Sequence, residues 1–177
     1  MGDILQQFFT AVFSNFTLSF LFLAALATAL SWALHRHRSG WDLWERALSY
    51  FLLFEIGLCF FYNFVMHVFF GAMAAAFIGW ADSPFQAEVG WASLGFSLLG
   101  VLGFRMGFEM RLAAIAASAC FLLGAASGHI VQMVTAHNFA PGNAGVIFWT
   151  DILVPIIGFA LLWMRYRRGR KLSTNPS

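Results

Sequence analysis

The amino-acid sequence predicts an all-α integral membrane protein, a bundle of five transmembrane helices with its N-terminus outside and its C-terminus inside. Three observations lead to this fold class: the composition, the number of long apolar stretches, and the distribution of the basic residues. Of the 177 residues, 60% are apolar and only 10% are charged, whereas soluble domains average about 25% charged residues. A small globule cannot hide that much apolar surface. The composition therefore excludes a soluble enzyme, a nucleic-acid-binding domain and a disordered segment, and it makes the lipid bilayer the expected partner.

Five apolar stretches are long enough to cross the hydrocarbon core, which takes about 20 residues of helix. They cover residues 11–34, 44–70, 85–104, 112–136 and 145–164. Residues 71–80 are also apolar, but this segment is too short to span, so it either continues the second helix or lies at the interface. We expect one transmembrane domain over 1–177, in which the first helix is added to a four-helix core at 44–164 and a basic cytoplasmic tail follows at 165–177.

The ten Lys and Arg residues support this threading because all of them fall where one side of the membrane would hold them. They are Arg36, Arg38, Arg46, Arg105, Arg111, Arg165, Arg167, Arg168, Arg170 and Lys171. The N-terminus and the connections at 71–84 and 137–144 contain none. Because Lys and Arg concentrate in cytoplasmic loops, the pattern places the N-terminus outside and the C-terminus inside.

Small residues are frequent in the third and fourth predicted helices, at 85–104 and 112–136. In lipid, small side chains favour helix pairing because they let two backbones approach closely. We therefore expect these two helices to form a tight pair at the centre of the bundle.

Polar residues recur along one face of the second predicted helix. Glu55, Cys59, Asn63 and His67 are spaced four residues apart, and each step of four turns the helix by about 400°. Ionisable groups at membrane depth are costly and commonly mark functional sites. The stripe therefore makes Glu55, Asn63 and His67 candidates for ligand binding or proton relay.

Glu55 lies near mid-depth, whereas Asn63 and His67 fall in the outer third of the membrane, where the other helices also carry polar groups. Glu88 begins the third helix, His129 and Gln132 lie in the fourth, and Asp151 lies in the fifth. Four helices thus contribute acid, amide and imidazole groups to one layer, which predicts a polar pocket facing the outer surface. Each group taken singly also fits a structural role as a hydrogen-bond partner within the bundle.

Binding is the first functional hypothesis. Glu88, His129 and Asp151 are the candidate metal ligands, and mixed imidazole and carboxylate ligands suit iron, zinc or manganese. A variant is haem b held between His67 and His129. A small polar ligand in the same pocket is equally compatible with these residues.

Three other hypotheses remain open at this point. The protein is a proton-coupled transporter or channel-like oligomer with Glu55 as a mid-membrane proton site, or an accessory subunit of a larger membrane complex. An intramembrane enzyme would use Glu88 or Asp151 with His129 as acid and base. No metalloprotease, hydrolase or nucleotide-binding motif is present, so we expect binding or transport, by a single chain or a homo-oligomer, over catalysis.

Several longer motifs carry a family resemblance. They are SPFQAEVG at 83–90, GHI at 128–130, NFAPGNAG at 138–145 and TDI at 150–152. With them, the region 51–163 resembles a bacterial family of small multi-pass membrane proteins classed as a domain of unknown function. The resemblance implies a protein of the bacterial inner membrane without an assigned activity, so it supplies no catalytic residues.

Overall fold

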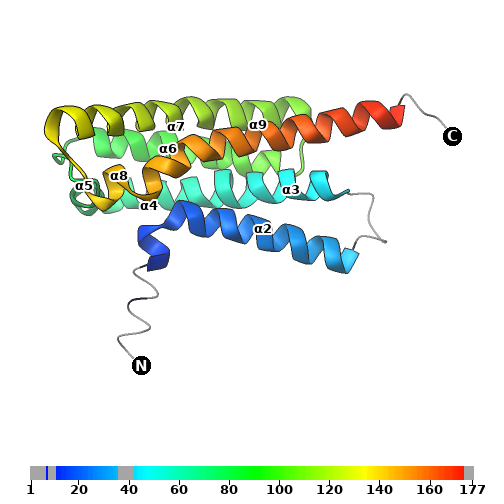
Figure 1. Cartoon of the computed structure of the whole chain (residues 1–177), viewed down its shortest axis with the longest axis horizontal. Helices are drawn as coiled ribbons and strands as arrows, with labels where there is room; N and C mark the ends of the chain where they lie inside the picture. Colours follow the sequence, from blue (N-terminus) through cyan, green and yellow to red (C-terminus); the bar gives the residue numbers. More distant parts are fainter. Residues whose placement is uncertain (1–6, 8–10, 36–41, 174–177) are drawn as a thin grey trace.

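A computed structural model describes residue 7 and residues 11–35 and 42–173, the last six of these by their backbone alone. All regular elements in these ranges are helical. They are α2 (Phe16–His35), α3 (Leu43–Phe51), η1 (Leu52–Leu58), α4 (Cys59–Phe69), α5 (Gly71–Ile78), α6 (Phe85–Gly103), α7 (Phe108–Ala136), α8 (Pro141–Ala144) and α9 (Val146–Ser173). The helices run side by side along one axis (Figure 1).

Five helical stretches in the described residues are long and apolar enough to cross a membrane. They are Phe16–His35, Leu43–Phe69, Phe85–Gly103, Phe108–Ala136 and Pro141–Arg167. The predicted all-helical bundle with five spans is therefore confirmed, and the five apolar helices indicate a multi-pass membrane protein. The side of the membrane on which each terminus lies stays a prediction.

The second span is not a uniform α-helix. Its central part, η1, is a π-helix that carries Glu55 and lies between α3 and α4. At Phe70 the backbone leaves the helical region, and the short apolar segment that follows forms α5. α5 ends at Gly79, whose φ of 75° is left-handed, a conformation that glycine adopts without strain at helix C-termini.

The small face of α6 packs mainly against the second span, so the predicted pairing of the third and fourth helices was wrong about its main partner. Gly100 shows the reason. A Cβ at Gly100 would lie 2.4 Å from the backbone nitrogen of Gly57 in η1, so only glycine permits this approach. The sequence showed that α6 has a small face, but a run of small residues does not indicate which helix covers that face.

One end of the bundle carries a group of charged residues that we call the arginine end: Glu45, Arg111, Arg165 and Arg46. Glu45 of α3 pairs with Arg111 Nη2 of α7 at 2.7 Å and also with Arg165 of α9. Arg111 further donates to the carbonyls that close α6, from Nε to Gly103 at 3.0 Å and from Nη2 to Phe104 at 3.3 Å. These bonds tie four helices together where the α7 start meets the α6 end.

The remaining basic residues extend this end. Arg46 is buried and donates to the hydroxyl of Ser31 and to the carbonyl of His35 at the end of α2. The side chains of three basic residues, Arg46, Arg111 and Arg165, therefore gather at one end, as the sequence predicts. The described residues do not include Arg36 and Arg38, nor the side chains of Arg168, Arg170 and Lys171.

Candidate functional site

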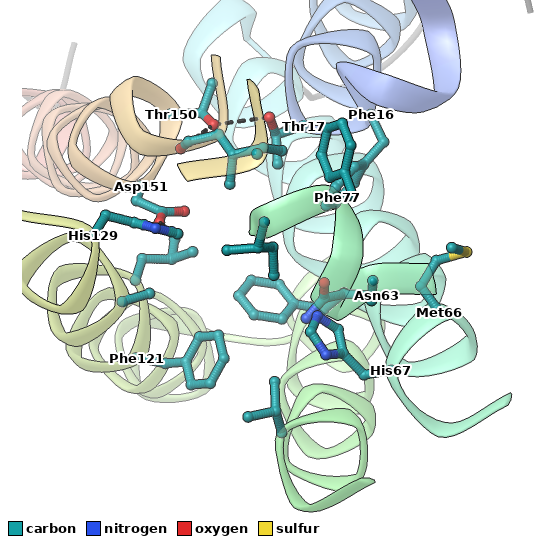
Figure 2. A pocket seen from close by; sticks show the side chains of 18 of the residues that line it. Phe16, Thr17, Asn63, Met66, His67, Phe77, Phe121, His129, Thr150 and Asp151 are labelled. Atoms are coloured by element: carbon teal, nitrogen blue, oxygen red, sulfur yellow. Dashed lines mark hydrogen bonds and ion pairs between the residues drawn. The ribbon is translucent and has the colours of Figure 1, made fainter. Parts of the chain in front are cut away.

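The other half of the bundle contains a cavity of about 1220 Å³. Its wall includes residues from α2, η1, α4, α5, α6, α7, α8 and α9, so all five spans contribute to it. Most of the lining side chains are apolar or aromatic, and Phe16, Phe77 and Phe121 are among them (Figure 2). The wall also includes exposed side chains, such as Phe13 and Met73. The cavity therefore reaches the surface of the bundle.

Asn143 organises one wall of the cavity from the short helix α8. It is fully buried, and its Oδ1 accepts a hydrogen bond from Trp80 Nε1 at 2.9 Å. Its Nδ2 donates to the carbonyl oxygens of Asn138, at 2.8 Å, and His129, at 3.3 Å. One amide thus joins the segment after α5 to α7 and to the turn before α8.

The same amide fixes the proton on His129. Trp80 can only donate, and the two carbonyls can only accept, so the amide of Asn143 has one orientation. Its Oδ1 lies 2.8 Å from His129 Nδ1, and this nitrogen therefore carries a proton. His129 Nε2 is left to face Asp151, with 3.5 Å between Nε2 and Oδ2.

Glycine at position 142 explains how α8 reaches this place. A Cβ on Gly142 would lie 2.7 Å from the ring and from the carbonyl oxygen of Phe77 in α5. A larger residue would push α8 away from α5, and Asn143 with it. The sequence motif at 138–145 therefore serves to press this turn against the cavity wall.

Three other polar contacts lie along the cavity. The hydroxyls of Thr17 and Thr150 are 2.8 Å apart and connect α2 with α9 (Figure 2). Asn63 donates to Ser93 at 2.9 Å, and His67 Nδ1 lies 2.5 Å from Gln86 Oε1. Six residues make these three contacts: Thr17, Thr150, Asn63, Ser93, His67 and Gln86. The first contact joins the first and last spans, and the other two join α4 with α6.

Two carboxyl groups in the cavity wall differ from the rest. Glu55 is 2% exposed and Asp151 is 4% exposed. Among the described residues, no donor forms a hydrogen bond with Glu55 Oε2 or Asp151 Oδ2, and no other fully buried side-chain nitrogen or oxygen lacks a partner. A buried polar atom without a partner is costly. These two oxygens are therefore the groups that a ligand would satisfy.

Four of the predicted site residues lie at the cavity together with His129: Glu55, Asn63, His67 and Asp151. Glu88 does not, and its placement corrects the predicted metal set. Gln86 and Val89 line the cavity from α6, whereas Glu88 is exposed. Two residues along a helix turn the chain by about 200°, so Gln86 and Glu88 face opposite sides. The prediction compared only how deep these residues lie in the membrane and did not consider which face of its helix each residue occupies.

Gln132 also lies outside the cavity. It follows His129 by three residues, which moves it about 4.5 Å further along α7, and it is absent from the lining. No three His, Cys, Asp or Glu side chains within the described ranges come together as a metal site. The candidate ligands Glu88, His129 and Asp151 are therefore not assembled around one point.

The arrangement gives no support to haem b between His67 and His129. His129 uses Nδ1 toward Asn143 and turns Nε2 to Asp151. His67 Nδ1 is taken by Gln86. An axial haem ligand needs a ring nitrogen that points at the iron, and both nitrogens of His129 point at protein groups.

Sequence reasoning missed several groups that shape the cavity. Trp80, Asn143, Thr17 and Thr150 were not among the predicted site residues. Trp80 directly follows the glycine that ends α5, and Asn143 sits in a Pro-Gly-Asn turn. Turn residues of this kind were the available signal, because a tight turn fixes the side chains next to it.

The comparisons with known proteins identify a family without an activity. Residues 14–171 match the model of a family of unknown function, DUF6790. Because this match covers most of the chain, the protein belongs to that family. The matched region begins before α2, whereas the resemblance drawn from the motifs covered 51–163. No match was found among the curated proteins or among the solved structures.

Proposed function

We propose that this member of the DUF6790 family binds a small lipid-soluble molecule in its intramembrane cavity. The observation that carries the proposal is the composition of the cavity wall: apolar and aromatic side chains surround a few fixed polar groups. Small-molecule sites in proteins have this composition, with volumes of about 300–1,000 Å³. The cavity, at about 1220 Å³, has room for a molecule of that size.

Access from the membrane supports a lipid-soluble ligand. Phe13, Met73 and Phe85 belong to the cavity wall and are also exposed at the surface of the helices. In a bilayer these side chains would contact lipid, so a molecule dissolved in the membrane could reach the cavity directly.

The other hypotheses rank below binding. A resident metal would need ligands that converge, and the described residues do not provide them. Transport and assembly into a larger complex stay predictions, since no contact in the structure favours either. We also infer that the arginine end faces the cytoplasm, because basic residues concentrate on that side of membrane proteins.

Cavity filling tests the proposal. Ala125 of α7 is half-buried and lines the cavity, so Ala125→Phe should occupy part of it. The probes are decanol and decylamine, added to purified protein in detergent while its thermal unfolding is recorded. We expect at least one probe to raise the Tm of the wild-type protein, because a ligand that binds only the folded state stabilises it by mass action. The Ala125→Phe variant should lose most of this shift.

Ala113→Phe is the matched control. Ala113 lies on the same helix, is exposed, and is outside the cavity lining. This variant should respond to the probes as the wild type does. If neither probe shifts the wild-type Tm, or if Ala125→Phe responds as strongly as Ala113→Phe, the proposed binding site is wrong.

A further inference from the structure

The buried polar atoms that lack partners in the described part of the chain are both acceptors. They are Glu55 Oε2 and Asp151 Oδ2, and both residues line the cavity. Several nearby donors are already engaged: Trp80 Nε1 and His129 Nδ1 bond to Asn143, and Asn63 bonds to Ser93, while His129 Nε2 faces Asp151. Two carboxyl oxygens in the cavity wall therefore lack a hydrogen-bond donor.

The two carboxyl groups are not equivalent. Asp151 faces the imidazole of His129, with 3.5 Å between Oδ2 and Nε2. An imidazolium at this place would balance the charge of the carboxylate. Glu55 has no such neighbour, because no ion pair or hydrogen bond links its side chain to any described residue. A ligand that supplies both a donor and a positive charge would fit Glu55 best.

The position of Glu55 in the chain agrees with this role. It lies in η1, and π-helical segments occur frequently at functional sites. Gly100 of α6 packs against the backbone of η1. The helix segment that carries Glu55 is therefore packed closely against α6, and Glu55 is one of the residues that line the cavity.

From these contacts we infer that the ligand is a lipid-soluble amine in its protonated form, and that Glu55 pairs with the ammonium group. This inference rests on the proposed binding function and adds the chemical class of the ligand. An ammonium N–H donates to the orphaned carboxylate oxygen, and the two opposite charges compensate each other where either one alone would be costly. Aromatic side chains in the wall, such as Phe77 and Phe121, favour a cation in the same space.

Competition between a charged and a neutral probe of equal length tests the inference. Labelled decylamine is bound to the purified protein at neutral pH and displaced by unlabelled decylamine or decanol. Binding to Ala125→Phe measures the amine that merely dissolves in detergent and is subtracted. We expect the wild-type protein to prefer the amine by at least about tenfold, which corresponds to about 1.4 kcal/mol.

Glu55→Gln should remove this preference and still bind decanol, which shows that the cavity is intact. The matched control is Glu109→Gln, since Glu109 is exposed at the start of α7 and outside the cavity lining, and it should keep the full preference. Equal affinity of the wild type for both probes, or an undiminished preference in Glu55→Gln, would overturn the inference and leave the proposed function standing. Absence of any binding above Ala125→Phe would instead refute the proposed function.

Discussion

The two halves of the bundle differ in the hydrogen-bond partners that they give to their carboxylates. At the arginine end, Glu45 is paired with both Arg111 and Arg165. At the cavity, Glu55 is more deeply buried, and no described residue donates to its Oε2. A glutamate therefore holds helices together at one end, whereas at the other end a glutamate remains available to a ligand.

This difference separates structural polar groups from functional ones. A network whose donors and acceptors are matched stabilises the fold and needs no ligand. Acceptors without donors are costly to the fold, and proteins retain such groups mainly where they do something else. Glu45 is half-buried and Glu55 is buried, and their partners separate them further: two arginines pair with Glu45, whereas no described residue donates to Glu55 Oε2.

The largest loss of stability should follow from breaking the arginine end, where donors and acceptors are paired. Arg111→Met removes the donors to Glu45, Gly103 and Phe104 while keeping an unbranched apolar side chain. We expect the free energy of unfolding to fall by about 3–5 kcal/mol, because Glu45 keeps only Arg165 and the carbonyls of Gly103 and Phe104 lose a donor, at about 1–3 kcal/mol for each buried group left without a partner. Thermal or denaturant unfolding in detergent measures this loss.

Arg105→Met is the control for that change. Arg105 lies exposed in the same connection between α6 and α7, and substitutions at exposed sites usually change stability by less than about 0.5 kcal/mol. Equal destabilisation by the two variants would mean that charge at this end matters and the specific network does not.

A smaller loss of stability is expected when the hydrogen bonds of Asn143 at the cavity wall are removed. Asn143→Ala removes the acceptor of Trp80 and His129 and the donor to two carbonyls. We expect about 2–3 kcal/mol of destabilisation, since several buried groups lose a partner at about 1–3 kcal/mol each and some regain water. The measurement is the unfolding midpoint, compared with Asn15→Ala, which loses a single exposed hydrogen bond to Ala11.

An effect of Asn143→Ala as small as that of Asn15→Ala would contradict the comparison. It would show that the hydrogen bonds of α8 are dispensable and that the cavity wall is not built around Asn143. A loss of the expected size would instead show that the hydrogen bonds of Asn143 stabilise this wall of the cavity.

Much of the fold could be predicted from the sequence because the bilayer imposes simple rules. Helix length follows from membrane thickness, so the five spans were predicted within a few residues at most ends. Basic residues at the ends of these spans gather as predicted: Arg111 and Arg165 share Glu45, and Arg46 bonds to the end of α2.

The site could be predicted only in part. Depth along the membrane brought His67, His129 and Asp151 into one layer, and all three line the cavity. The helix face decided the rest: Glu88 is exposed because it lies two residues after Gln86. The π-helix around Glu55 has no clear sequence signal, since it depends on how closely Gly100 approaches its backbone.

The most direct test of the account compares Glu45→Gln with Glu55→Gln in one unfolding experiment. Glu45→Gln should lower the free energy of unfolding by about 2–3 kcal/mol, because Arg111 and Arg165 lose their shared carboxylate. Glu55→Gln should change it by less than about 1 kcal/mol or raise it, since no described residue donates to the oxygen that is replaced. If Glu55→Gln proves as destabilising as Glu45→Gln, Glu55 is a structural group and the account of the cavity is wrong.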